Sequence, residues 1–124
     1  MRALVVDDSR AIRLILARML ADLGMVALEA GDANVAEELL VGQGPFDLAI
    51  VDWNLPGRDG AELISAFEDT EHRPRVVVTT VPRDRADVAD DALRAGADTV
   101  IEKPFAREEF VALLVRLGLA RRAA

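Results

Sequence analysis

The sequence contains no cysteine among its 124 residues. This absence excludes a disulfide framework, a thiol nucleophile and a thiolate metal site. Long apolar runs are also missing, because none approaches the roughly 20 residues that a membrane-spanning helix needs. The first apolar run ends at Asp7 and Asp8, which is too early for a signal peptide. We therefore expect a cytoplasmic protein without a membrane-inserted segment.

Positive charge is scarce as well, since 15 Lys and Arg residues and 22 Asp and Glu residues give a net charge of −7. An excess of acids disfavours binding to nucleic acid or to an anionic membrane, and favours cations or basic partners. Hydrophobic residues still make up 52% of the chain, which is typical of a folded protein and not of a disordered one. The length suits one domain over residues 1–124, with no internal repeat or linker.

Short apolar segments alternate with stretches in which apolar residues recur at helical spacing. The short segments predict five buried strands, at residues 3–6, 25–28, 48–51, 75–79 and 99–102. The helical spacing predicts five helices, with apolar positions within 12–23, 35–40, 63–67, 88–95 and 110–117, the third helix extending to about Glu71. The alternation predicts an α/β fold: a doubly wound (βα)5 three-layer sandwich with a parallel five-stranded sheet and right-handed crossovers. Periodicity alone does not give the strand order, and we expect 2-1-3-4-5 because it is a common order among doubly wound sheets of this size.

The stretch from Leu48 to Gly60 is the most informative part of the chain. Its first four residues predict a strand buried on both faces, and the run stops at Asp52. The loop at residues 55–60 is rich in Pro and Gly and continues neither a strand nor a helix. Open α/β sheets bind ligands at the carboxyl ends of such strands. Asp is also a common turn residue, so Asp52 alone leaves both interpretations open.

Polar residues also follow other predicted strands. Together with Asp52 they form one candidate set at the carboxyl edge of the sheet: Asp7, Asp8, Asp52, Thr79, Thr80 and Lys103. Three carboxylates in one pocket repel one another unless a cation lies among them. Ligands that are all oxygen favour a hard ion such as Mg²⁺. A hydroxyl and an ammonium beside a carboxylate suit transfer of a phosphoryl group to that carboxylate, because they neutralise phosphoryl oxygens.

Each member of this set also has a simpler explanation. Asp8 can cap the first helix together with Ser9, the two threonines can be ordinary strand-end residues, and Lys103 can be a solvated side chain. All of these explanations must hold at once if the set has no function. Their joint occurrence favours the chemical interpretation.

Five motifs follow one another along the chain: Val5-Val6-Asp7-Asp8, Val51-Asp52-Trp53-Asn54-Leu55-Pro56-Gly57-Arg58-Asp59-Gly60, Val78-Thr79, Ala95-Gly96-Ala97-Asp98 and Lys103-Pro104-Phe105. In this order they resemble the receiver domain of two-component response regulators. The resemblance spans essentially the whole chain. It implies a single-domain, CheY-like regulator, and we expect no output domain.

The resemblance implies a role for each residue of the set. Asp52 would accept a phosphoryl group from the phosphohistidine of a sensor histidine kinase or of a histidine phosphotransfer protein. Mg²⁺ would be held by Asp7, Asp8, Asp52 and the backbone carbonyl of Asn54. Thr79 and Lys103 would bind phosphoryl oxygens, and a cis peptide bond would join Lys103 to Pro104.

The resemblance also implies how the signal leaves the domain. Phosphorylation would shift the fourth helix, fifth strand and fifth helix between two states. This face would bind a downstream protein, with the regulator acting as a monomer or as a phosphorylation-dependent dimer. We expect a phosphoacceptor with Mg²⁺-dependent self-dephosphorylation, and not an enzyme that acts on an outside substrate.

Two departures from the family pattern affect the switch. Val100 occupies the place of the usual Tyr or Phe, so the switch would run on backbone and loop movement. The segment after Thr79 is longer than usual, which leaves Thr80 as a second candidate for the switch hydroxyl. If Thr79 is the switch hydroxyl, the bulk of Thr80 would restrict access to the acyl phosphate.

Three other functions are alternatives. A small aspartyl-phosphate phosphatase would carry a second acid two residues after the nucleophile, where this chain has Asn54. A nucleotide- or flavin-binding protein would place a Gly- or Ser/Thr-rich loop after the first strand, where Asp7 and Asp8 would repel phosphate. A receiver fold that binds its partner without phosphorylation also fits the sequence.

Overall fold

A computed structural model describes residues 1–121 of the chain. Its elements are β1 (Arg2–Val6), α1 (Arg10–Asp22), β2 (Val26–Ala30), α2 (Ala33–Gln43), β3 (Leu48–Asp52), α3 (Gly60–Glu68), β4 (Arg75–Thr80), η1 (Pro82–Asp84), α4 (Arg85–Ala95), β5 (Thr99–Glu102) and α5 (Arg107–Arg116). All neighbouring strands are parallel. The sheet order β2-β1-β3-β4-β5 is the one expected for a doubly wound sheet of this size.

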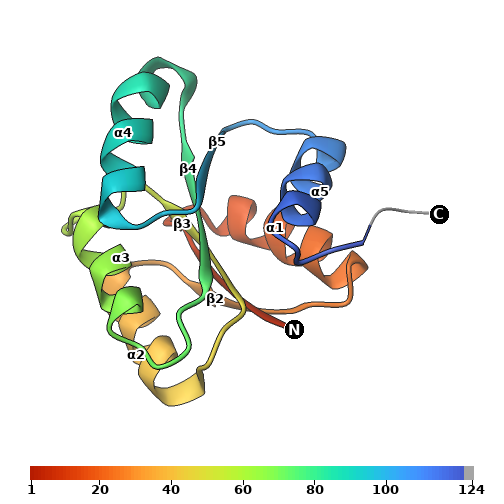
Figure 1. Cartoon of the computed structure of the whole chain (residues 1–124), viewed down its shortest axis with the longest axis horizontal. Helices are drawn as coiled ribbons and strands as arrows, with labels where there is room; N and C mark the ends of the chain where they lie inside the picture. Colours follow the sequence, from red (N-terminus) through yellow and green to blue (C-terminus); the bar gives the residue numbers. More distant parts are fainter. Residues whose placement is uncertain (122–124) are drawn as a thin grey trace.

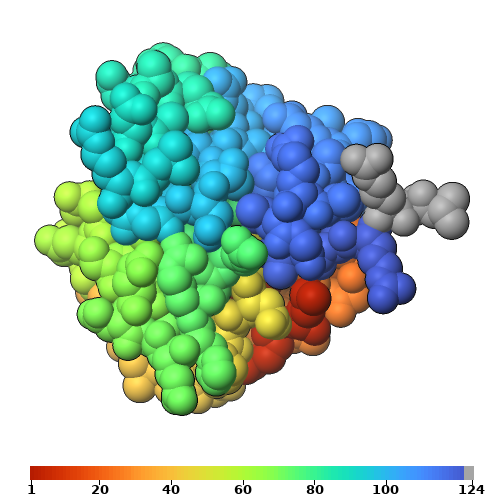
Figure 2. All heavy atoms as spheres, viewed as in Figure 1, coloured from red at the N-terminus to blue at the C-terminus, as the bar shows by residue number. Residues whose placement is uncertain are grey.

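Helices cover both faces of the sheet (Figure 1). Helices α2, α3 and α4 pack on one face, and α1 and α5 pack on the other. Because successive strand residues point to opposite faces, β3 sends Val51 into the first core and Ile50 into the second. Phe67 of α3 and Phe110 of α5 are fully buried in these two cores. Figure 2 shows that side chains close the gaps that the ribbon leaves between the layers.

Caps fix where two helices begin relative to the strand ends. The Ser9 hydroxyl accepts a hydrogen bond from the backbone N–H of Ile12 and starts α1 directly behind the first acidic pair. Asp59 accepts one from the backbone N–H of Ala61 at 3.0 Å and starts α3. Each cap satisfies a helical N–H that has no partner within the helix. The segment between Asp52 and Asp59 is therefore a loop with both ends anchored.

β3 extends one residue beyond its predicted end to include Asp52, and two other strands also extend beyond theirs. β2 begins one residue after Met25 and runs to Ala30, because it pairs with β1 along its whole length. β4 runs past Thr79 to Thr80, because Thr80 pairs with Glu102 of β5. Strand pairing, which depends on residues far away in the sequence, decides both boundaries.

Two features of helical structure also differ from the prediction. α3 ends at Glu68 and does not reach Glu71. The Thr70 hydroxyl donates a hydrogen bond of 2.7 Å to the carbonyl oxygen of Phe67, which belongs to the last turn of α3. A side chain thus satisfies a carbonyl that a longer helix would bond through its backbone. The residues after Val81 form the 3₁₀ helix η1, where the sequence predicted a loop. Within residues 1–121, no helix has the length and apolar content to cross a membrane.

Candidate functional site

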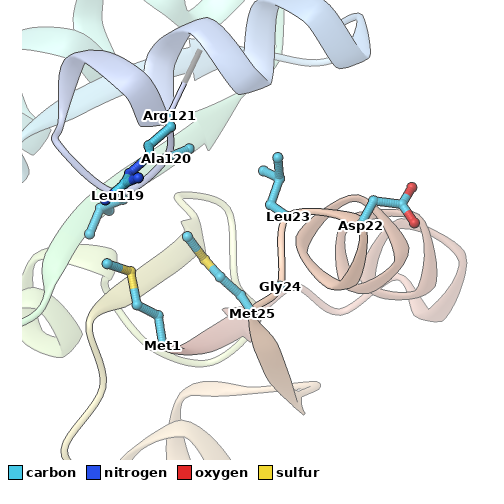
Figure 3. A pocket seen from close by; sticks show the side chains of 8 residues that line it. All are labelled: Met1, Asp22, Leu23, Gly24, Met25, Leu119, Ala120 and Arg121. Atoms are coloured by element: carbon cyan, nitrogen blue, oxygen red, sulfur yellow. The ribbon is translucent and has the colours of Figure 1, made fainter. Parts of the chain in front are cut away.

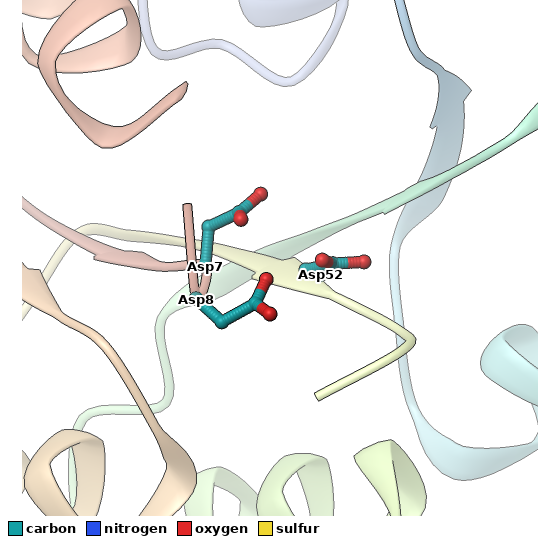
Figure 4. Close-up of side chains that lie close together, drawn as sticks. All are labelled: Asp7, Asp8 and Asp52. Atoms are coloured by element: carbon teal, nitrogen blue, oxygen red, sulfur yellow. The ribbon is translucent and has the colours of Figure 1, made fainter. Parts of the chain in front are cut away.

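The carboxyl edge of the sheet brings the three predicted acids together. The register pairs Val6 with Val51, so the residues that follow them, Asp7 and Asp52, lie beside each other. Asp8 adds a third carboxylate from the turn before α1. One ligand oxygen from each side chain lies within 4.8 Å of the others, and Figure 4 shows the three acids gathered at the ends of β1 and β3. Asp7 and Asp52 are 2% and 6% exposed, whereas Asp8 is exposed to solvent.

Lys103 joins the two buried acids. Its Nζ lies 2.6 Å from Asp7 Oδ2 and 3.2 Å from Asp52 Oδ2. The other oxygen of each acid accepts a backbone hydrogen bond, from Ser9 N–H at 2.8 Å and from Asn54 N–H at 3.1 Å. Both carboxylates are thus held in fixed orientations with one oxygen turned to the ammonium. The bond from Lys103 to Pro104 is cis, as the resemblance implies.

Burial and charge together set the protonation behaviour of this cluster. Burial raises the pKa of Asp52, and the Asn54 N–H and the Lys103 ammonium lower it only in part. Burial by itself would lower the pKa of Lys103, but the hydrogen bond to Asp7 and the charge of Asp52 raise it above its usual value. The ammonium is therefore charged at neutral pH, while ionisation of Asp52 is less favourable than that of a solvated aspartate because its pKa is raised.

The strand register distinguishes the two candidate threonines. Asp52 pairs with Thr79 across β3 and β4, so these side chains point to the same face of the sheet. Thr80 follows in the same strand and points to the opposite face. The Thr79 hydroxyl is buried and has no hydrogen-bond partner among residues 1–121, whereas the Thr80 hydroxyl lies 3.5 Å from the carbonyl oxygen of Val81. This arrangement favours Thr79 as the hydroxyl that would meet a group on Asp52.

Replacement of Thr79 by valine tests this assignment. A buried hydroxyl without a partner costs stability, so Thr79→Val should keep or raise the free energy of unfolding in urea. The same variant should form a phosphoryl adduct about tenfold more slowly, because a donor to the developing charge is lost. Thr80→Val is the matched control and should leave the rate near that of the wild type. Slowing by Thr80→Val and not by Thr79→Val would assign the switch hydroxyl to Thr80.

The donor set fits a hard divalent cation. All three acidic side chains offer oxygen, and the described chain brings no imidazole or thiolate into the group. Two of the acids are buried and oriented, and the exposed Asp8 leaves one side open to the water that Mg²⁺ retains. Asp7, Asp8 and Asp52 would hold the ion, and Asn54 lies two residues after Asp52 in the loop behind it. When bound, the ion would neutralise negative charge on incoming phosphoryl oxygens.

Sequence reasoning missed one residue that shapes the cluster. Arg13 of α1 donates to the backbone carbonyl oxygen of Asp7 at 2.7 Å and pairs with Glu29 of β2 at 3.2 Å. It contacts the main chain at the end of β1, whereas Lys103 contacts the Asp7 side chain. The position of Arg13 near the start of α1 hardly predicts a contact with Asp7, because an arginine on an amphipathic helix is ordinarily solvated.

A separate cavity of about 390 Å³ lies at the other edge of the sheet. Met1 and Met25, which precede β1 and β2, contribute to its wall together with Leu23 and Leu119 (Figure 3). The amino ends of parallel strands meet at that edge, so this cavity has no part in the acidic cluster.

Comparison with known proteins agrees with the fold. The family model described as the response regulator receiver domain matches residues 3–115, and the chain belongs to this family. The chemotaxis protein CheY of Pseudomonas aeruginosa is 36% identical over 109 residues, which cover 85% of this chain and 86% of that protein. The chemotaxis protein CheY-3 of Vibrio cholerae is 32% identical over 108 residues, covering 85% and 82%.

Solved structures give the same result. The chemotaxis response regulator CheY4 of Vibrio cholerae superposes with a TM-score of 0.79 at 27% identity, covering 94% of this chain and 97% of the other. The protein is thus a receiver domain of the CheY type, a class that acts in two-component signalling. Receiver domains interact with histidine kinases and downstream targets and bind Mg²⁺ at an acidic pocket of this kind.

Proposed function

We propose that this chain is a single-domain response regulator in which Asp52 accepts a phosphoryl group from a phosphohistidine, with Mg²⁺ bound by the acidic cluster. The phosphoryl donor would be a sensor histidine kinase or a histidine phosphotransfer protein. One observation carries the proposal: Lys103 Nζ lies between Asp7 and Asp52 on the edge that also holds the unpartnered Thr79 hydroxyl. An acceptor, a cation and a hydroxyl donor are thereby available to one phosphoryl group.

The chemistry follows from these positions. A carboxylate oxygen of Asp52 attacks phosphorus, the P–N bond of the phosphohistidine breaks, and the imidazole nitrogen keeps the electron pair and takes up a proton. Asp52 then carries an acyl phosphate and loses its own negative charge. Lys103 is free to turn from the carboxylate to the phosphoryl oxygens, and the Thr79 hydroxyl gains the acceptor that it lacks. Hydrolysis of the acyl phosphate by water would return the protein to its starting state.

The proposed output surface is the face formed by α4, β5 and α5, which a downstream protein would bind. Val100 of β5 is 7% exposed and packs in the core beneath α4, so no aromatic ring can rotate there. Movement of Thr79 would instead act through the end of β4 and η1 on the start of α4. Arg85 at that start pairs with Glu102 of β5 at 3.7 Å, so α4 and β5 would move as neighbours.

Catalytic turnover of an outside substrate is not part of this proposal. The residue two positions after Asp52 is Asn54, and its side chain cannot donate a proton to a leaving group as an acid would. Self-dephosphorylation is the reaction that we assign to the domain. Partner binding without phosphorylation is the alternative, and the experiment below separates the two.

The wild-type protein is expected to gain a single phosphoryl adduct when it is incubated with a small-molecule phosphodonor and Mg²⁺. With excess chelator the adduct should be absent, because the acids around Asp52 then repel the incoming phosphoryl group. Intact mass measures both results. If neither the small donor nor a phosphorylated histidine protein yields an adduct, the phosphoacceptor function is wrong and partner binding without phosphorylation replaces it.

A further inference from the structure

The β3–α3 loop, residues 53–59, carries a side chain to which the proposed chemistry gives no role. Arg58 is 26% exposed and faces back across the loop toward α2. Its guanidinium lies 2.8 Å from Glu37 and 3.3 Å from the side-chain oxygen of Asn34, both on α2, and 3.6 Å from Glu62 on α3. One side chain therefore connects the loop to two helices.

The remaining contacts of the loop leave its middle weakly held. At one end the Trp53 N–H donates to Thr79 O at 3.0 Å, and the Trp53 ring lies so close to Gly60 that a Cβ there would come within 2.9 Å of it. Leu55 is 7% exposed and packs in the core. Gly57 has a φ of +81°, a conformation that glycine adopts without strain. Among the described residues, every polar contact between this loop and α2 comes from Arg58.

We infer that Arg58 is a positioning residue that ties the loop to α2 and thereby holds Asn54 in place beside the acidic cluster. This inference rests on the proposed function, in which the Asn54 carbonyl is a ligand of Mg²⁺. The planar guanidinium presents five N–H donors in a rigid fork, whereas the ammonium of a lysine is a point charge with three donors, so the two side chains do not make equivalent contacts here. A mobile Asn54 would lose part of its hydrogen bond to Asp52 as well as its place around the metal.

The direction in which Mg²⁺ affinity changes when Arg58 is replaced distinguishes this positioning role from long-range electrostatics. Removal of Arg58 makes the surroundings of the cluster more negative, so electrostatics alone would tighten the binding of Mg²⁺. Loss of the contacts between Arg58 and α2 would weaken Mg²⁺ binding, because binding would then also have to order the loop. Arg58→Met should therefore bind Mg²⁺ about threefold to tenfold more weakly than the wild type. Arg58→Lys, which keeps the charge, should lie between the two.

Glu37 and Glu38 provide a matched pair of positions for a second test. Both are acids of α2, but Glu37 contacts Arg58 and Glu38 does not. Glu37→Gln and Glu38→Gln remove the same charge. Any additional loss of Mg²⁺ affinity in Glu37→Gln therefore measures the contribution of the contact between Arg58 and Glu37. The double variant Arg58→Met with Glu37→Gln should be no weaker than Arg58→Met alone, because the contact is already absent.

The experiment is a Mg²⁺ titration of the full chain, followed by Trp53 fluorescence and by calorimetry, with the urea midpoint of each variant measured alongside. A purely structural role would shift the urea midpoint and leave the Mg²⁺ dissociation constant unchanged. The inference is overturned if Arg58→Met binds Mg²⁺ as tightly as the wild type or more tightly, or if Glu37→Gln and Glu38→Gln behave alike. A wild type that binds no Mg²⁺ would instead contradict the metal site of the proposed function, and this inference with it.

Discussion

Asp52→Asn is expected to abolish the phosphoryl adduct that the wild type forms with a small phosphodonor and Mg²⁺. The amide has no anionic oxygen to attack phosphorus, and among the described residues Asp52 is the acid that contacts both Lys103 and the Asn54 N–H. Intact mass after equal incubation times measures the result. Asp69→Asn, at an exposed acid just past α3, is the control and should be labelled like the wild type. An adduct that persists in Asp52→Asn would assign the acceptor to another residue.

The same variant should change the pH dependence of stability in the absence of Mg²⁺. Burial raises the pKa of Asp52 above its ordinary value of 3.8, so the folded chain holds this proton more tightly than the unfolded chain. The wild type therefore loses stability as the pH rises from about 3.8 through the higher folded pKa. Asp52→Asn lacks this loss, and its advantage in urea midpoint over the wild type should grow across that pH range. An advantage that shrinks with rising pH would contradict the assigned direction.

Lys103→Met is expected to have the second large effect. The variant removes the cation that contacts both Asp7 and Asp52 and leaves two buried carboxylates facing each other. Adduct formation should slow about a hundredfold, which is typical for loss of a preorganised charge at a reacting group. Without Mg²⁺ the free energy of unfolding should fall by about 1–3 kcal/mol, and Mg²⁺ should restore part of it because the ion replaces the missing charge.

Two features make the Lys103 experiment easy to interpret. Lys103 is the single lysine among the 15 Lys and Arg residues, so an amine-reactive reagent reports on this side chain and on the amino terminus alone. Lys103→Arg is the control, because it keeps the charge but replaces a compact ammonium with a planar guanidinium. It should retain more stability than Lys103→Met and remain slow in adduct formation. Equal rates for the wild type and Lys103→Met would exclude a role for the ammonium in phosphoryl transfer.

The positions of the acids could be predicted because strands and their ends are encoded locally. The run from Leu48 to Val51 is too short for a helix and ends at a carboxylate, and β1 follows the same pattern before Asp7. Hydrophobic periodicity depends on neighbouring residues only. Parallel strands then place their carboxyl ends at one edge, so the sequence was sufficient to predict an acidic cluster before any contact was known.

Pairwise contacts could not be predicted in the same way. The sequence left Thr79 and Thr80 as alternatives, and the pairing of β3 with β4 separated them, because a shift of one residue turns a side chain to the other face. The contacts of Arg13 and Arg58 were not predicted from the sequence, since an arginine carries no sign of its partner in its own neighbourhood. Strand pairing likewise decided the ends of β2 and β4.

The sequence by itself thus determined the alternation of strands and helices, the five-stranded sheet and the acids at its carboxyl edge. Only the tertiary structure decided that Lys103 contacts Asp7, 96 positions away, as well as Asp52. It also decided that the Thr79 hydroxyl is buried without a hydrogen-bond partner among residues 1–121, and that Arg58 joins the β3–α3 loop to α2. The physical reason is that periodicity is a property of neighbouring residues, whereas a contact between distant side chains depends on register, face and burial across the whole sheet.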